Sequence, residues 1–268
     1  MSDRTVAPIS AGDVVTLEEL GWLRRTSGVR GAGLVLHAWA TIAAAMTAYA
    51  LWPSPLTLVV AVAVVGSRQL GLAVLMHETA HWLLLPGLKP NTRVGSWLCA
   101  APIWNDLPSY RRSHHLHHRH VRGPEDPDLA ASAAFPVPSR RLGIQALRDL
   151  CGWTVGARVL AWRPWRASEP MDWRRLRLPL GGNAVLLGTL AATGHWWLYP
   201  LLWLLPLVTW YPLLCRLRDV AEHGMVADDV DPLQNTRTTA AGLLARAFFA
   251  PYWVSFPDGY RAHQVRLD

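Results

Sequence analysis

Two clusters of histidines have the spacing that metal ligands take on helices. In the first cluster, His77 and His81 stand four residues apart. The second cluster contains three histidines at positions i, i+3 and i+4: His114, His117 and His118. Such spacings place the imidazoles of each cluster on one helix face. Imidazole binds iron, copper and zinc, so the clusters predict two helices that together enclose one or two metal ions. His115 and His120 are open to interpretation as ligands, supporting groups or solvated side chains.

The first cluster also matches His-Glu-x-x-His, the pattern of zinc metallopeptidases, in which Glu78 would be the general base. An intramembrane zinc protease using His77, Glu78 and His81 is therefore an alternative function. Two observations disfavour it. A single zinc ion does not need a second histidine cluster, and no Asp-Gly motif that would supply a third ligand lies in a later apolar segment.

The segments that must position these histidines are long and uncharged. Hydrophobic residues make up 51% of the chain, and neither 31–67 nor 178–215 contains Asp, Glu, Lys or Arg. Uncharged apolar runs of this length are typical of membrane spans. We expect helices over about 31–52 and 56–85, joined by a turn at Trp52–Pro55. The 38 residues of 178–215 would be about 57 Å long as one helix, so we expect them to fold back at Gly194–Pro200.

The sequence thus predicts an all-α polytopic membrane protein with four transmembrane helices in two hairpins. Most arginines lie in the segments between and beyond them: four in 1–30, thirteen in 105–177 and six in 216–268. Positive residues stay on the cytoplasmic side, so we expect a multi-pass protein of the cell membrane with both termini cytoplasmic. No nucleic-acid-binding module is visible, and membrane lipids are the expected surroundings.

These arguments divide the chain into five parts. We expect a cytoplasmic N-terminal segment with a surface helix (1–30), a first hairpin (31–86), an interfacial segment and cytoplasmic loop with the second histidine cluster (87–177), a second hairpin (178–215) and a cytoplasmic, histidine-bearing cap (216–268). Within the third part, 93–104 is too short to cross and is predicted to be interfacial or re-entrant, and 142–159 to be a surface helix. Arg68 lies near the middle of the second helix, where a charge is costly and by default functional or paired.

With these motifs in place, the chain resembles the membrane fatty-acid desaturase family. That family carries HxxxH, matched by His77 and His81, and then a Tyr-Arg-Arg element followed by HxxHH, matched from Tyr110 to His118. Pro-Glu-Asp-Pro-Asp-Leu at 124–129 is similar to the segment that follows in many members. Arg218-Asp-Val-Ala-Glu-His223-Gly, with Asn235-Thr-Arg-Thr-Thr239 after it, is similar to a later stretch that contributes one more histidine.

The resemblance implies a non-haem di-iron enzyme that uses O₂ to introduce a double bond into a lipid acyl chain. It implies seven ligands: His77, His81, His114, His117, His118, His223 and His263. Acidic side chains near these histidines are candidates for orienting the imidazoles, namely Asp126, Asp219 and Glu222, and Arg68 is a candidate for structuring the site from below. The chain shows no fused haem or flavin domain, so we expect an external electron donor such as a ferredoxin-like acidic protein on the arginine-rich face.

One part of the family pattern is incomplete. The family has a third HxxHH after a segment like Ala250-Pro-Tyr-Trp-Val254, but here only His263 follows, with Pro257 and Arg261 where ligands would be expected. We therefore expect the second iron to be held weakly, and an inactive truncated homologue is an alternative. A di-iron lipid hydroxylase or carotenoid ketolase is a second alternative, because these enzymes share the histidine clusters. The Glu-Asp-Pro-Asp and Ala-Glu-His-Gly segments favour the desaturase.

Overall fold

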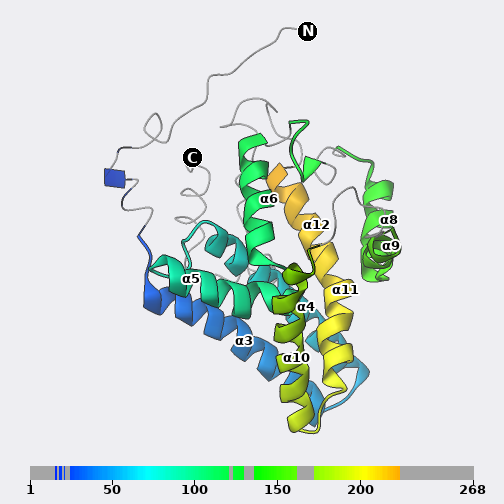
Figure 1. The fold of residues 1–268 in the computed structure, drawn as a ribbon. Coiled ribbons are helices and arrows are strands. Elements are labelled where there is room, and N and C mark those ends of the chain that lie inside the picture. Colours follow the sequence, from blue (N-terminus) through cyan, green and yellow to red (C-terminus); the bar gives the residue numbers. More distant parts are fainter. Residues whose placement is uncertain are drawn as a thin grey trace.

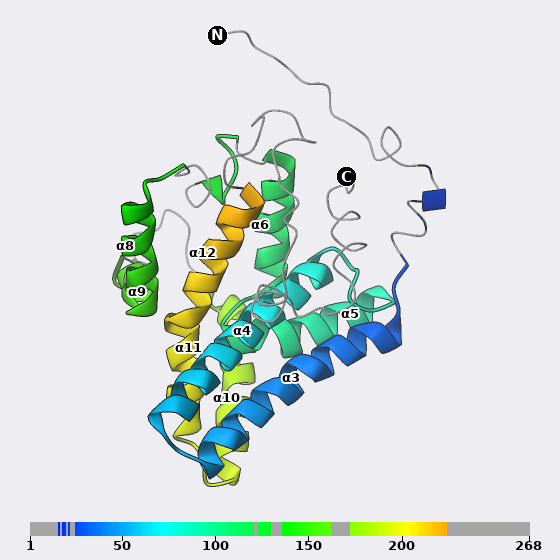
Figure 2. The same cartoon turned by 180° about the vertical axis from the view of Figure 1, so that it is seen from behind.

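The computed structural model describes residues 25–120, 123–129, 136–161 and 172–223, together with Thr16, Glu18, Glu19 and Gly21. Within those ranges every regular element is helical and no strand occurs, which confirms the all-α fold class for that part of the chain. Three helices are long and apolar enough to cross a membrane: Gly28–Leu51, Pro55–Ala80 and Tyr199–Val220. Figures 1 and 2 show these helices as one bundle, with α6 standing at the end opposite the two interhelical turns.

The first hairpin consists of α3 (Gly28–Leu51) and α4 (Pro55–Ala80). Ser27 caps α3 by accepting a hydrogen bond from the backbone N–H of Arg30. Ser54 forms a reciprocal capping box with Thr57, and Pro55 occupies the first turn of α4, where its missing N–H costs nothing. The turn therefore lies where the sequence predicted it. At 24 and 26 residues, each helix is longer than the roughly 30 Å hydrocarbon core of a bilayer.

The second uncharged segment also folds back, at the predicted place. The helix α10 (Arg177–Ala192) is followed by a turn in which Gly194 has φ +79°. The chain returns through η5 (Tyr199–Leu204), α11 (Leu205–Val208) and α12 (Trp210–His223). With 16 residues, α10 is about 24 Å long, and it is preceded by the short helix η4 (Trp173–Leu176). It is shorter than the three candidate spans.

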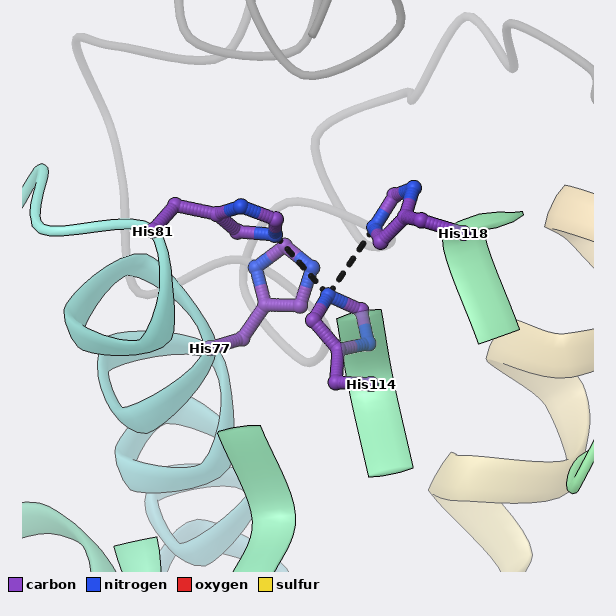
Figure 3. Close-up of side chains that lie close together, drawn as sticks. All are labelled: His77, His81, His114 and His118. Carbon is purple, nitrogen blue, oxygen red and sulfur yellow. Dashed lines mark hydrogen bonds between the residues drawn. The ribbon is translucent and has the colours of Figure 1, made fainter. Parts of the chain in front are cut away.

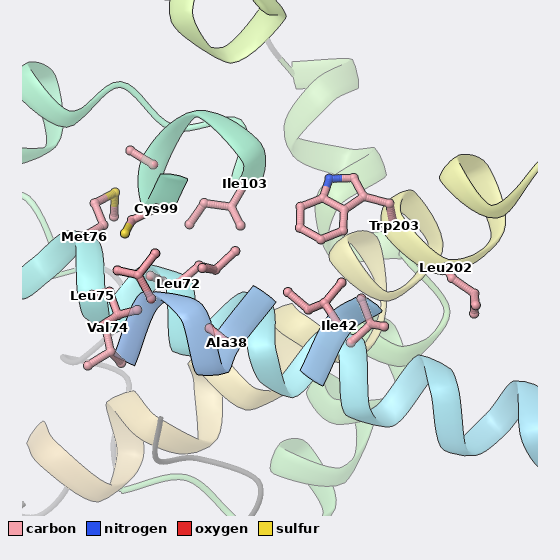
Figure 4. Close-up of a cluster of buried hydrophobic side chains, with 14 of the residues drawn as sticks. Ala38, Ile42, Leu72, Val74, Leu75, Met76, Cys99, Ile103, Leu202 and Trp203 are labelled. Carbon is pink, nitrogen blue, oxygen red and sulfur yellow. The ribbon is translucent and has the colours of Figure 1, made fainter. Parts of the chain in front are cut away.

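The core of the bundle forms around α4, which packs against α3, α11 and α12. Figure 4 shows Leu72 and Leu75 of α4 with Ile42 of α3 and Trp203 of η5 in one cluster of buried apolar side chains. A Cβ at Gly31 would collide with the Leu84 backbone. The lack of a side chain at Gly31 therefore lets α3 approach the turn that follows α4.

The segment 93–104 was predicted to be interfacial or re-entrant, and it lies inside the bundle. It belongs to a bent run of α5 (Leu88–Val94), η1 (Gly95–Ala100) and η2 (Ala101–Ile103). Side chains from three other elements donate to its carbonyl oxygens: Trp39 to Leu98 at 3.0 Å, Asn183 to Ala101 at 2.9 Å and Trp203 to Pro102 at 3.1 Å. Irregular backbone is tolerated at membrane depth only with such internal partners.

Two predicted surface helices have different outcomes. In the N-terminal one, Thr16 and Glu19 form a capping box, but most of that helix lies outside the described residues. The predicted helix over 142–159 is two helices, α8 (Ser139–Leu150) and α9 (Trp153–Ala161). They are separated at Gly152, which has a φ of +72°. Glycine adopts this backbone conformation without steric cost.

Candidate metal centre

The first histidine cluster stands at the end of α4, which stops earlier than predicted. The sequence predicted a helix to about Leu85, whereas α4 ends at Ala80 with His81 as its C-cap. Trp82 has φ +57° and turns the chain away. A helix end leaves carbonyl groups without partners, and here other elements supply donors to them. Asn91 donates to the Thr79 carbonyl oxygen at 3.0 Å.

Arg111 of α6 holds the same helix end. Its Nη2 donates to the carbonyl oxygen of Thr79 at 3.0 Å and its Nε to that of Ala80 at 3.1 Å. Its guanidinium carbon lies 4.6 Å from the centroid of the Trp82 ring, within the range of a cation–π interaction. Partial burial lowers the pKa of Arg111, and the side chain remains a cation. Arg111 thus joins the helices that carry the two clusters.

The second cluster lies on α6 (Leu107–His120), whose first turn is capped by the Asp106 carboxylate accepting from the Ser109 N–H at 3.0 Å. His114 and His117 are buried and His118 is half-buried. His115 points instead to the helix end described above, with its Nε2 3.3 Å from the Ala80 carbonyl oxygen. His120 lies 3.2 Å from Glu125 and is partly exposed.

Four imidazoles from the two helices converge. One ring nitrogen from each lies within 4.8 Å of those of the others, in a group made of His77, His81, His114 and His118. Figure 3 shows the rings facing a common centre. His114 Nε2 lies 2.9 Å from His81 Nε2 and 3.0 Å from His118 Nε2.

The electrostatics at His114 favour its neutral imidazole. Burial lowers the pKa of His114, and the neighbouring His118, His81 and His117, with Arg218, lower it further. Neutral imidazole is the form that binds metal. The arrangement can therefore offer several nitrogen lone pairs to one cation, and this donor set fits iron and also zinc.

His117 stands beside this group and has its own partner. Its Nδ1 lies 2.7 Å from Oδ1 of Asp126, whose side chain is fully buried, and 3.8 Å from Oδ2 of Asp128, whose side chain is largely exposed. The Asp128 N–H also donates to Asp126 Oδ1 at 2.8 Å. A carboxylate on Nδ1 fixes the tautomer and leaves Nε2 for a metal. The sequence predicted one group of five histidines; the structure places four together and the fifth against Asp126.

The remaining candidates are spread along the chain. Arg68 is buried in α4, nine residues before His77. Asp219 lies on α12, and the backbone of that helix includes Glu222 and His223, whose side chains lie outside the description. His263 falls entirely outside the described residues.

Sequence reasoning missed Asn91, which is fully buried and accepts from the Leu85 N–H at 3.0 Å besides its bond to Thr79. Nothing in its local sequence points to this role.

Comparison with known proteins adds the family. The family model for fatty acid desaturase matches residues 50–254. This range contains both histidine clusters, all of α4, and His223. The chain belongs to the fatty acid desaturase family. It is also 28% identical over 242 residues to the dihydrorhizobitoxine desaturase of Bradyrhizobium elkanii, an alignment that covers 83% of this chain and 68% of the relative. The family and the three apolar helices indicate a membrane protein. Membership of the desaturase family indicates an oxidoreductase.

Proposed function

We propose that this protein is an O₂-dependent desaturase that introduces a double bond into a lipid acyl chain at a histidine-held pair of iron ions. The observation that carries the proposal is the convergence of four imidazoles from α4 and α6 in a member of the desaturase family. An imidazole-rich site built from two helices suits a redox metal. It also exceeds what a single-zinc protease requires.

The described residues that would hold iron are the four converging histidines and His117. His223 and His263 are proposed to add ligands from the C-terminal part of the chain. Bound iron would supply the activation of O₂ for removal of two hydrogens from the acyl chain, with two electrons from an outside donor, two protons from solvent and formation of two waters. Because the third histidine motif is incomplete, we expect the second iron to be held less tightly than the first.

Several residues have roles that do not require contact with substrate. Asp126 accepts the Nδ1 proton of His117 and so directs its Nε2 toward the metal side. Glu78, 3.2 Å from His77 Nδ1, is placed to do the same for His77. Arg111 and Asn91 fix the carbonyl groups just before His81. Together these contacts preorganise the imidazoles before a metal arrives.

The substrate proposal has a second candidate. The relative from Bradyrhizobium elkanii is named for dihydrorhizobitoxine, so that compound is an alternative to a fatty acyl lipid. A lipid hydroxylase or ketolase reaction remains the alternative chemistry at the same site.

The activity test is expression of the full chain in membranes of a host that lacks the product, followed by lipid profiling. His117→Ala is the matched inactive control. New unsaturated acyl chains that require His117 would support the proposal. Hydroxylated or ketonic products would replace it with the alternative chemistry. Conversion of supplied dihydrorhizobitoxine without any change in lipids would make that compound, and not an acyl lipid, the substrate. No product from protein that retains iron would favour the inactive homologue.

The proposed topology has four spans, with α10 as the third crossing and both termini on the cytoplasmic side of the cell membrane. The turns near Ser54 and Tyr199 would then be external, because they carry no arginine, whereas 105–177 carries thirteen. Reporter fusions at these two positions should read as external and a fusion after Arg148 as cytoplasmic. A cytoplasmic signal at Ser54 would overturn this orientation.

Electrons are proposed to come from a small acidic carrier such as a ferredoxin-like protein. Exposed arginines, among them Arg112, Arg119 and Arg141, give the histidine-bearing end of the protein a positive charge that would attract such a partner. Reduction of the purified enzyme by a ferredoxin should slow steeply as ionic strength rises, because exposed charges are screened. A rate independent of salt would contradict this partner.

A further inference from the structure

The helices α8 and α9 carry large apolar side chains that are exposed. Six large apolar side chains on them are exposed: Ile144, Leu147, Leu150, Trp153, Val159 and Leu160. On α8, Leu147 and Leu150 lie on the face away from the buried Asp149. Large apolar side chains exposed together on one hairpin are typical of a protein or membrane contact.

The turn between the two helices reaches the middle of a candidate span. A Cβ at Gly152 would lie 3.5 Å from the carbonyl oxygen of Val208 and 3.9 Å from the side chain of Thr209. Val208 is nine residues into the span Tyr199–Val220, about 14 Å along a helix. A bilayer core is about 30 Å thick, so the turn lies near mid-depth if that helix crosses the membrane.

An ion pair eight residues beyond Val208 along the same span joins the hairpin to α12. Arg216 of α12 donates through Nε to Asp149 Oδ2 at 2.5 Å and through Nη2 to Oδ1 at 3.0 Å. Thr154 of α9 donates to Asp149 Oδ1 at 2.5 Å, and the Asp149 side chain is fully buried. Bidentate arginine–carboxylate pairs are both strong and directional. Figures 1 and 2 both show α8 beside α12.

The charges of α8 are distributed as a membrane interface requires. Arg140 and Arg141 are exposed at the start of α8, the end farther from the Gly152 turn. Arg148, nearer the turn, is also exposed, and an arginine can extend its long side chain toward the headgroups. Apolar side chains at the turn and arginines at the opposite end match a segment that enters a bilayer from one side.

We propose that the α8–α9 hairpin (Ser139–Ala161) is embedded in the membrane beside α11 and α12, with its exposed apolar side chains in contact with lipid acyl chains. It is a re-entrant element and not a surface helix. The proposal rests on the crossing of the membrane by Tyr199–Val220 and is independent of the oxidoreductase activity.

The chain contains a natural probe for this proposal, because Cys151 is exposed at the turn whereas Cys99 is buried. A nitroxide attached to Cys151 of full-length Cys215→Ala protein, in nanodiscs of phosphatidylcholine and phosphatidylglycerol, would report its surroundings by relaxation enhancement. Cys151→Ser in the same background measures any labelling of Cys99. Ser139→Cys, in the background that lacks Cys151, gives the matched site at the other end of α8.

The expected result is that O₂ relaxes the label at Cys151 more than a water-soluble nickel chelate does, with the order reversed at Ser139→Cys. Stronger relaxation by nickel at Cys151 would place the turn in water and overturn the proposal. Weak relaxation by both reagents would mean that protein covers the face, from this chain or a second copy, and would also overturn it. A label on Leu147→Cys, in the background without Cys151, should give the same result as a label on Cys151. This second site controls for a local disturbance of the turn by the label.

Discussion

Asp126 and His117 form a buried carboxylate–imidazole pair, with Oδ1 2.7 Å from Nδ1. His117 lies in the last turn of α6, and Asp126 follows the end of that helix. His117 keeps this partner while its ring lies beside the four converging imidazoles, 5.7 Å from that of His118 between centroids. A carboxylate in this position increases the basicity of a ligand and fixes its ring, so His117 is prepared for a metal through its second nitrogen.

Asp126→Asn should lower the metal content of the protein. An amide cannot accept the imidazole proton as strongly as a carboxylate, and loss of such a partner typically reduces metal affinity about 10–100-fold. Iron per chain, measured by elemental analysis after equilibration with a weak chelator, checks the effect. Asp128→Asn is the matched control, because Asp128 is largely exposed and lies 3.8 Å from His117 Nδ1. Equal iron loss in both variants would contradict a special role for Asp126.

His118→Ala and His120→Ala should differ, although the two residues are two positions apart on α6. His118 belongs to the converging group, whereas His120 is partly exposed beside Glu125. We expect His118→Ala to reduce bound iron and abolish product, and His120→Ala to leave both within about twofold, since exposed substitutions usually change little. Iron loss in His120→Ala comparable with that in His118→Ala would show that His120 is a ligand.

Glu78→Gln separates the desaturase from the zinc protease. In a protease Glu78 would be the general base, so the Glu78→Gln variant would be inactive. In the proposed desaturase Glu78 only accepts a hydrogen bond from His77 at 3.2 Å, which the carbonyl oxygen of glutamine also accepts. Product formation should therefore persist at a reduced rate. Purified protein that contains zinc in place of iron and loses a proteolytic activity on this substitution would establish the protease.

The sequence predicted the elements whose signals are local. The α3–α4 turn was evident from Trp52-Pro-Ser-Pro55, and the fold-back near Gly194 followed from the length of the uncharged run alone. The spacing of His77 and His81 predicted a shared helix face, because helical periodicity is a property of neighbouring residues. These features need no knowledge of what packs against them.

The features that the sequence did not predict depend on contacts between distant residues. The stop of α4 at Ala80 depends on Arg111, 31 residues away, which donates to the Ala80 carbonyl oxygen. The carboxylate partner of His117 is Asp126, nine residues away along the chain. The division of 142–159 into two helices follows from Gly152, a residue that helices tolerate at a cost of about 1 kcal/mol, and from the packing of that turn against α11.

Asn91→Ala should destabilise the protein and reduce activity without removing any candidate ligand. The Asn91 side chain is fully buried, accepts from the Leu85 N–H and donates to the Thr79 carbonyl oxygen, both at 3.0 Å. Its removal takes the acceptor from the Leu85 N–H, at about 1–3 kcal/mol, and one donor from the Thr79 carbonyl oxygen, which keeps its bond from Arg111. Because these groups lie on either side of His81, we expect the ring of His81 to lose its fixed position as well.

Thermal unfolding in detergent and iron content together check this prediction. Asn91→Ala should lower Tm by several degrees and weaken iron retention, whereas Lys89→Ala, an exposed position in the same helix, should change neither. Asn91→Asp is the more informative partner variant. Its carboxylate still accepts from Leu85 but cannot donate to Thr79, so it should lie between the wild type and Asn91→Ala in both measurements. A lowered Tm with unchanged iron retention would restrict Asn91 to a purely structural role and leave His81 positioned by α4 and Arg111 alone.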